Sequence, residues 1–163
     1  MMSHMDRTIT SLDVSEDLVA EFEREWIEAW NAHDLDRILS HYRDDVRFVS
    51  PIAARFGAPH GELRGRRALR EYFARGLATY PALQFQPIAA LGGIGSIALY
   101  YRSVENRAAI EVMELDARGQ VRRAAAHYGA APRSVSPRVP PATTPAGSHH
   151  ATTPSCGPST KRP

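Results

Sequence analysis

An apolar stripe near the start of the chain is the feature that most restricts its fold. Asp13 is the expected N-cap of a helix, with Glu16 three residues later in the capping-box position. Large apolar residues then recur at every fourth position, the spacing of one helix face: Leu18, Phe22, Trp26 and Trp30. A helix with such an aromatic face must pack it against another layer of structure.

A second short helix and a strand are expected directly after this helix. Asn31 to His33 end the first helix, and Asp34 is placed to cap the next one. The apolar face of that second helix comprises Leu35, Ile38, Leu39 and Tyr42. Asp44-Asp45 predicts a turn, and the run from Val46 to Ser50 predicts a strand closed by Pro51.

The remainder of the domain predicts one more helix and four strands. Residues 51–64 are expected to form a loop, and a helix from about Arg66 to Thr79 follows, with Pro81 as its stop. The expected strands are Leu83–Leu91, Ser96–Ser103, Ala108–Asp116 and Gln120–Tyr128. The expected turns between them are Gly92-Gly93, Glu105-Asn106 and Ala117-Arg118-Gly119. Helices followed by an antiparallel meander indicate an α+β fold.

Composition divides the chain into three parts. We expect a flexible leader at 1–12, one domain at 13–131 and a disordered tail at 132–163. The tail holds eight of the 12 prolines and ten Ser or Thr residues, so it has little apolar surface to bury. Without its four cations, 16 arginines face 18 acidic residues, a net charge of −2. Nothing therefore marks the domain as a nucleic-acid binder.

The sequence also indicates the cellular compartment of the protein. No apolar run approaches the roughly 18 residues that a membrane span requires. The first residues lack the apolar middle region of a signal peptide. The single cysteine, Cys156, cannot form a disulfide within the chain. We therefore expect a cytoplasmic protein without a membrane partner.

The order of elements and three segments resemble the nuclear transport factor 2-like (NTF2-like) superfamily. Within it, the chain is similar to the SnoaL-like polyketide cyclases and the ketosteroid isomerases. The segments, within about residues 14–130, are AWNAHDLDRILSHYRDDVRFVSP, LRGRRALREYFARGL and ELDARGQVRRAAAHYG. The resemblance implies an NTF2-like cone, in which three N-terminal helices pack in a strongly curved, mainly antiparallel sheet around a deep apolar cavity. It also implies a homodimer through the outer sheet face and chemistry without a cofactor.

The catalytic groups of the ketosteroid isomerases are only partly present. Their base is an Asp directly before a Pro at the end of the first strand, and Ser50 before Pro51 stands there. Their tyrosine donor corresponds to Trp26, and their protonated-Asp donor corresponds to Glu111. Serine cannot shuttle a proton as a carboxylate does, so steroid isomerisation by that mechanism is not expected.

Glu111 is the candidate catalytic residue, as an acid or hydrogen-bond donor. Strand alternation puts Glu111 and Met113 on one face and Glu114 on the other, and leaves open which face lines the cavity. A glutamate among large apolar neighbours is shielded from water, which raises its pKa. The alternative is an ordinary strand glutamate paired with an arginine, with Glu114 as the second candidate acid.

The other candidate ligand-binding residues are Trp26, Ser50, His60, Tyr101, Met113 and Tyr128. Trp26 would offer its indole N–H to a ligand, whereas Trp30 is expected to pack in the core. Of Tyr100 and Tyr101, only one can face inward, and the pattern does not say which.

The histidines favour neither a metal site nor a clear catalytic base. None of the seven histidines is part of an HxH motif or of an i, i+4 pair with a glutamate. No metal is therefore expected. His60 and Glu62 are an acid–base pair at the expected cavity mouth or ordinary surface residues. His127 is expected to point away from the cavity, and His41 to lie on a helix surface.

Three functions are compatible with these residues. The first is a cofactor-free isomerase, cyclase or lyase that acts on a hydrophobic carbonyl compound. The second is a non-catalytic binder of a hydrophobic small molecule, and the third is a dimeric interaction module with a vestigial cavity. A roomy pocket with a buried acid favours the first, a roomy pocket without a titratable group the second, and a cavity filled by side chains the third.

Overall fold

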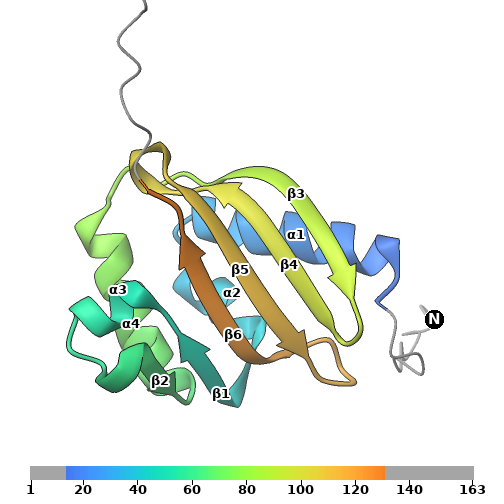
Figure 1. The fold of residues 1–163 in the computed structure, drawn as a ribbon, viewed down its shortest axis with the longest axis horizontal. Coiled ribbons are helices and arrows are strands. Elements are labelled where there is room, and N and C mark those ends of the chain that lie inside the picture. Colours follow the sequence, from blue (N-terminus) through green and yellow to red (C-terminus); the bar gives the residue numbers. More distant parts are fainter. Residues whose placement is uncertain (1–13, 131–163) are drawn as a thin grey trace, which may run out of the picture. The chain divides into compact units, whose positions relative to one another are not determined.

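The computed structural model describes residues 14–130 and shows an α+β fold, as predicted (Figure 1). The helices are α1 (Glu16–Asn31), α2 (Leu35–Ser40), α3 (Pro51–Arg55) and α4 (Arg66–Thr79), with short 3₁₀ turns η1 (Pro59–Gly61) and η2 (Val104–Asn106). The strands are β1 (Tyr42–Val49), β2 (Glu62–Arg64), β3 (Gln86–Gly93), β4 (Ser96–Arg102), β5 (Ala108–Leu115) and β6 (Val121–Tyr128). The predicted leader and tail lie outside the described residues.

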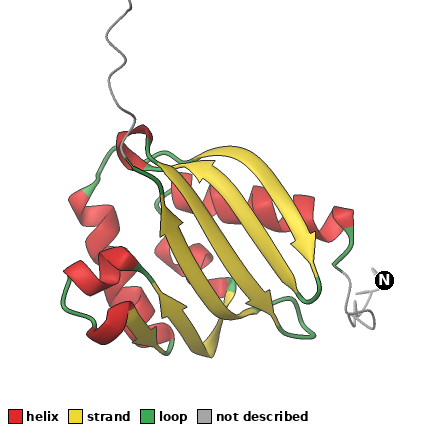
Figure 2. Cartoon of the chain, viewed as in Figure 1, coloured by secondary structure: helices red, strands yellow, loops and turns green. Residues whose placement is uncertain are grey.

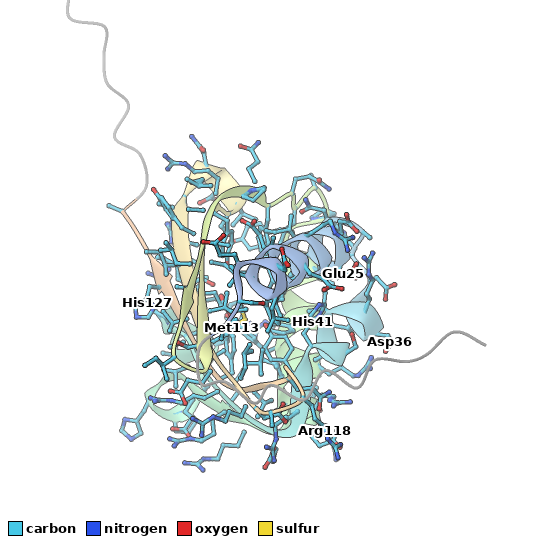
Figure 3. The ribbon with its side chains drawn as sticks, turned by 90° about the vertical axis from the view of Figure 1, so that its right-hand side faces the viewer. Glu25, Asp36, His41, Met113, Arg118 and His127 are labelled. Atoms are coloured by element: carbon cyan, nitrogen blue, oxygen red, sulfur yellow. The ribbon has the colours of Figure 1, made fainter. Side chains whose placement is uncertain are left out.

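The six strands form one curved sheet that does not close on itself (Figure 2). Their order is β2-β1-β6-β5-β4-β3, and β1 and β6 form the one parallel pair in the described domain. The long helix α1 lies across one face of the sheet, and the other face is uncovered by helices (Figures 1 and 3). The aromatic face of α1 therefore packs against the inner face of the sheet, where the core lies.

Local capping rules explain where the helices begin. Ser15, and not the expected Asp13, is the N-cap of α1, since its Oγ accepts a hydrogen bond from the backbone N–H of Leu18 at 3.3 Å. Asp34 caps α2 as predicted, and accepts from the N–H of Arg37 at 3.0 Å. The predicted bounds of the helix from Arg66 to Thr79 are confirmed.

The segment 51–64, expected to be a loop, contains α3, η1 and β2. The missed signal is Ser50 followed by Pro51, because serine is a preferred N-cap and proline fits the first helical position. The Ser50 Oγ accepts from the N–H groups of Ile52 at 3.1 Å and Ala53 at 3.4 Å. The buried serine that replaces the carboxylate of the isomerases is thus a helix cap.

Two expected turns are also different in the structure. Asp44 and Asp45 lie inside β1, which begins at Tyr42 and has an irregular register with β6. β3 continues through Gly93, so the hairpin to β4 turns at Ile94 and Gly95 instead of Gly92-Gly93. Gly95 has a φ of 58°, the left-handed conformation that glycine adopts without a Cβ clash.

Strand register decides which alternating residues face inward. One inner row of paired residues is Tyr101, Ala109 and Tyr128, and the next is Leu99, Glu111 and Ala126. Glu111 and Met113 are buried, whereas Ile110 and Val112 are 41% and 38% exposed. The face of β5 that carries Glu111 is therefore the inner one, and Glu114 is on the outside.

No helix in residues 14–130 is long and apolar enough to cross a membrane.

Candidate functional site

A narrow aromatic cavity lies between the helices and the inner face of the sheet. Its volume is about 70 Å³, less than half of the roughly 150 Å³ cavity that holds benzene in another protein. It is lined by Trp26, Trp30, Phe48, Ile52, Tyr72, Phe73, Gly76, Tyr80, Leu83, Phe85, Tyr101, Ser103, Val104, Glu111 and Tyr128. The deep cavity predicted from the resemblance is thus largely narrowed by aromatic side chains.

Glu111 is the one carboxyl group that lines this cavity in the described domain. Its side chain is buried, with the residue 3% exposed, and its Oε2 accepts a hydrogen bond from the Tyr101 hydroxyl at 3.3 Å. Burial raises the pKa of Glu111 from 4.5 to about 8, although the hydrogen bond from Tyr101 opposes this rise. At neutral pH the carboxyl group is therefore mostly protonated and able to donate a hydrogen bond.

Glu114 is excluded as the cavity acid. It lies on the outer face of β5 and forms ion pairs with Arg122 at 3.0 Å and Arg123 at 3.1 Å. The alternative interpretation paired Glu111 with an arginine. The structure instead pairs Glu114 with arginines, on the opposite face of the same strand.

Four tyrosines surround the Glu111 carboxyl group. They are Tyr42, Tyr72, Tyr101 and Tyr128, and burial is the largest cause of the raised pKa of each. A negative charge on Glu111 would raise these pKa values further, because it opposes a second negative charge nearby. The four phenols therefore stay protonated, and three of them, Tyr72, Tyr101 and Tyr128, line the cavity beside the neutral Glu111 acid.

Ser50 lies behind the cavity wall and does not line it. It is 1% exposed, and its Oγ is 3.0 Å from the hydroxyl of Tyr72, which does line the cavity. Tyr128 lines the cavity, as expected, and its pKa responds to both Ser50 and Tyr72. Ser50 is therefore a positioning residue for the tyrosine wall.

The two tryptophans have exchanged the roles that the sequence suggested. Both line the cavity, but the indole N–H of Trp26 donates to the Tyr42 hydroxyl at 3.0 Å. The Nε1 of Trp30 is buried and has no hydrogen-bond partner within residues 14–130. Trp30 was expected only to pack in the core. Its indole is nevertheless the one with a free N–H donor.

The other predicted ligand-binding residues divide into one inside and two outside the site. Tyr101, and not Tyr100, faces inward and lines the cavity. Met113 is fully buried between sheet and helices (Figure 3), but it does not line the cavity. His60 is exposed on η1, and Glu62 pairs with Arg47 at 2.9 Å, so of the two interpretations the structure favours ordinary surface residues over an acid–base pair.

The remaining histidine expectations have mixed outcomes. His127 is exposed on the outer side of the sheet, as predicted (Figure 3). His41 is half-buried instead of on a helix surface, with its ring edge-on to Phe22 at 5.3 Å, and burial lowers its pKa. The part of the chain that the structure describes contains no cluster of three His, Cys, Asp or Glu side chains able to hold a metal.

An outer groove of about 480 Å³ adjoins the cavity at the end of β4. Residues shared by the cavity and the groove are Tyr80, Leu83, Ser103 and Val104. The rim of the groove carries polar side chains, including Gln86, Arg102 and Glu105. A ligand can therefore place a slender end in the cavity and a larger part in the groove.

The end of α1 is tied to the segment that forms this mouth. The Asn31 side chain donates to the Phe85 carbonyl at 3.0 Å and accepts from the Phe85 N–H at 2.6 Å. His33 bonds the carbonyl of Leu83 at 2.9 Å through Nε2. These bonds fix Phe85, whose ring stacks on Trp26 and contacts Tyr101.

Several cavity residues were not among the sequence candidates, including Tyr72, Gly76 and Phe85. Gly76 carried a usable signal, because glycine in a helix usually needs a reason. Its φ is not in the left-handed range, and a Cβ at this position would meet no atom within 4 Å. Neither the backbone nor the packing requires glycine there, and its effect is to leave the cavity wall open.

Gly76→Ala should stabilise the protein and narrow the cavity. Alanine restricts the unfolded chain and suits the helix, so we expect a gain of about 0.5–1 kcal/mol in the free energy of unfolding. Denaturant unfolding measures this gain. Ala78→Gly, at an exposed position of the same helix, is the matched control and should lose a similar amount. A loss of stability in Gly76→Ala would show that the space beside Gly76 is closed.

The family of the chain is established by its sequence. Residues 24–130 match the SnoaL-like domain. The chain belongs to the SnoaL-like family. A SnoaL-like protein of unknown function from Burkholderia thailandensis shares 42% sequence identity with it, at a TM-score of 0.70. That match covers 72% of this chain and 98% of the other.

More distant structures share the fold of this SnoaL-like protein. A proposed isomerase of the SnoaL-like family from Agrobacterium tumefaciens is 13% identical, with a TM-score of 0.57 over 69% of this chain and 98% of the other. SalBIII, an epoxide hydrolase/cyclase-like enzyme in pyran ring formation of salinomycin, is 19% identical, with a TM-score of 0.56 over 71% and 94%. The predicted superfamily and fold are confirmed, but a shared fold does not fix the reaction. Among curated proteins, none matches the chain.

Proposed function

We propose that this SnoaL-like protein binds a small carbonyl compound and that protonated Glu111 acts on the carbonyl oxygen as hydrogen-bond donor and general acid. The observation that carries the proposal is a single buried carboxyl group in an aromatic cavity, with its pKa raised to about 8. A neutral acid in such surroundings stabilises negative charge that develops on a carbonyl oxygen. The Tyr101 hydroxyl, 3.3 Å from Oε2, would then stabilise the carboxylate that remains.

The chemistry that this arrangement supports needs no cofactor. A carbonyl polarised by Glu111 has more acidic C–H bonds on the neighbouring carbon, and a water molecule from the outer groove would take that proton while Glu111 gives its own to the carbonyl oxygen, which is the first step of many isomerisations, cyclisations and eliminations. Burial shields Glu111 from bulk water, which strengthens the effect of the neutral acid. The narrow cavity and the wider groove favour a ligand whose carbonyl end is slender.

A pH titration of ligand binding tests the proposal. Methyl propyl ketone is a slender carbonyl probe, and the fluorescence of the chain's two tryptophans reports its binding because both line the cavity. If only the neutral acid binds, affinity should be constant below about pH 7 and about tenfold weaker at pH 9. Glu111→Gln should bind independently of pH, and the control Glu114→Gln should follow the wild type. The same pH profile in all three proteins would contradict the proposal.

The second candidate function is non-catalytic binding of the same kind of ligand. It is favoured by Ser50, which caps α3 at the position of the isomerases' base, and by the lack of a second acidic side chain in the cavity lining of the described domain. Exchange of the ketone's protons for deuterium in D₂O separates the two. A catalyst accelerates this exchange and loses the acceleration in Glu111→Gln, whereas a pure binder leaves the exchange rate unchanged.

We also propose that the protein is a homodimer that pairs through the outer face of the sheet. One outer row of paired residues is wholly apolar: Leu91, Ala98, Val112, Ala125 and Val49. The row beside it is Ala89, Tyr100, Ile110 and His127. The row on the other side carries Glu114, Arg123 and Arg47, so the apolar strip is bordered by charges of both signs, which suits pairing with a second copy.

Val112→Glu should convert this dimer to a monomer. The new carboxylate would be placed at the centre of the apolar row, where pairing would strip it of water. Sedimentation at micromolar concentration should show a dimer for the wild type and a monomer for the variant. Ala78→Glu, at an exposed position of α4, is the control and should remain dimeric. A monomeric wild type would refute the interface.

With Cys156 as the only cysteine in the chain, we keep the cytoplasm as the proposed compartment.

A further inference from the structure

We propose that Trp30 donates the second hydrogen bond of the cavity, and that the natural ligand carries a second acceptor oxygen besides its carbonyl. This inference rests on the proposed function, because it concerns the same ligand in the same cavity. It departs from the sequence comparison, which placed the helical donor at Trp26.

Trp26 already uses its donor within the protein. Its indole N–H donates to the Tyr42 hydroxyl at 3.0 Å, and both residues are almost fully buried. To donate to a ligand, Trp26 would have to leave the buried Tyr42 hydroxyl without this bond, which is unfavourable. Trp26 therefore contributes an apolar surface and not a donor.

Trp30 has the opposite arrangement. It is 7% exposed and lines the cavity, and its Nε1 is buried without a hydrogen-bond partner in the described domain. Most buried donors in folded proteins are paired, and an unpaired one needs an explanation. An acceptor brought by a ligand would pair this N–H, so the free protein carries a cost that binding removes.

Trp30 and Glu111 line the same cavity from different layers of the fold. Glu111 comes from β5 in the sheet, and Trp30 comes from the last turn of α1 in the helix layer. The Trp30 ring contacts Phe85 at 5.2 Å and Phe73 at 4.8 Å between centroids. A ligand held between these layers would offer its carbonyl oxygen to Glu111 and a second oxygen to Trp30.

Gly76 provides the space that such a ligand needs. On α4, Phe73 and Gly76 are three residues apart and share one helix face, and Tyr80 is the residue directly after the helix; all three line the cavity. Phe73 contacts Trp30, whereas Tyr80 also lines the outer groove. The open space beside Gly76 thus lies between the aromatic interior and the mouth.

Two probes of equal shape test the second acceptor. Methoxyacetone and methyl propyl ketone differ by one ether oxygen in place of a CH₂ group, so both offer a carbonyl but only the first offers a second acceptor. In the wild type, the ether oxygen should be paired by Trp30, and methoxyacetone should bind at least as tightly. The Trp30 indole N–H resonance in a ¹⁵N spectrum should move downfield with methoxyacetone and not with the ketone.

The variants assign the effect to one indole. Trp30→Phe should make methoxyacetone about tenfold weaker relative to the ketone, because the buried ether oxygen is then unpaired. Trp26→Phe removes an N–H that Tyr42 already holds, so the wild-type preference should persist. Gly76→Ala should weaken both probes alike, because it fills space without removing a donor.

The outcomes separate this inference from the proposed function. If the ketone titrates with Glu111 but methoxyacetone behaves the same in the wild type and Trp30→Phe, the proposed function stands and the Trp30 donor is refuted. An indole resonance unchanged by methoxyacetone also refutes the donor, even if Trp30→Phe does not fold, and would point to an N–H directed at the Phe73 ring. If neither probe binds at tens of millimolar, both proposals are refuted.

Discussion

Glu111→Gln is expected to be more stable than the wild type at neutral pH. The folded protein holds the Glu111 proton up to a pKa of about 8, whereas the unfolded chain releases it near 4.5. Between these values the unfolded state binds fewer protons, so the free energy of unfolding of the wild type falls as pH rises. The full difference amounts to roughly 5 kcal/mol, of which roughly 3 kcal/mol is already lost at pH 7. Glutamine cannot ionise and avoids this loss.

The measurement is denaturant and thermal unfolding of both proteins at several pH values. The variant should have a Tm on the order of 10 °C higher at pH 7, and the two proteins should converge near pH 4. Glu114→Gln is the control, since it removes two exposed ion pairs, which contribute at most about 1 kcal/mol each. Its pH dependence should match the wild type. Equal stability of Glu111→Gln and wild type at pH 7 would mean that water or a cation reaches the carboxyl group.

This prediction connects stability with the proposed function. A buried acid that destabilises the fold at neutral pH has no structural reason to be there, since Gln at the same site would accept the same bond from Tyr101. A variant that gains stability while its ligand binding loses pH dependence would show that the Glu111 carboxyl group serves the ligand.

Asn31→Ala is expected to destabilise the domain by about 2–3 kcal/mol. The substitution removes both hydrogen bonds to the backbone of Phe85, at 2.6 and 3.0 Å, and leaves its N–H and C=O without these partners. Phe85 would also be freer to move. Because its ring lines the cavity, the affinity for methyl propyl ketone should fall together with the free energy of unfolding. Denaturant unfolding and the tryptophan titration measure the two effects.

Two variants test this explanation. Gln84→Ala removes a single bond to the Asn31 carbonyl at an exposed site and should cost less than about 0.5 kcal/mol. Asn31→Asp keeps the acceptor for the Phe85 N–H, but its carboxylate faces the Phe85 carbonyl and cannot donate. Its stability relative to wild type should improve below about pH 4, where the acid is protonated and can donate. An equal loss of stability in Asn31→Ala and Gln84→Ala would show that the two hydrogen bonds from Asn31 to the Phe85 backbone are not the cause.

Much of the fold could be predicted from local patterns in the sequence. The helix from Arg66 to Thr79 and the cap at Asp34 are in the structure as expected, because periodicity and capping depend on residues a few positions apart. The same kind of signal was present but not used at Ser50-Pro51, where α3 begins. Errors at Asp13 and at Gly92-Gly93 moved a helix start or a turn by two residues or fewer and left the topology unchanged.

The site was predictable only in part. Alternation put Glu111 and Glu114 on opposite faces, but the choice between them depended on which face of the sheet the helices cover. Met113 shares the inner face with Glu111 and yet does not reach the cavity, because packing around it closes the space. A residue's face follows from strand period, whereas its access to a cavity depends on the volumes of all its neighbours.

By itself, the sequence determined the order of the elements apart from α3, η1 and β2, the two faces of each strand, and the presence of the acid Glu111 among apolar residues of β5. The tertiary structure alone decided that this acid is buried, that the cavity is only about 70 Å³, and that Trp30 rather than Trp26 has the free N–H. The physical reason is the range of the contacts. Backbone patterns are set within a few residues, whereas Trp26 meets Tyr42 16 residues away and Asn31 meets Phe85 54 residues away. Hydrogen-bond partners and free volume therefore exist only once distant segments have packed together.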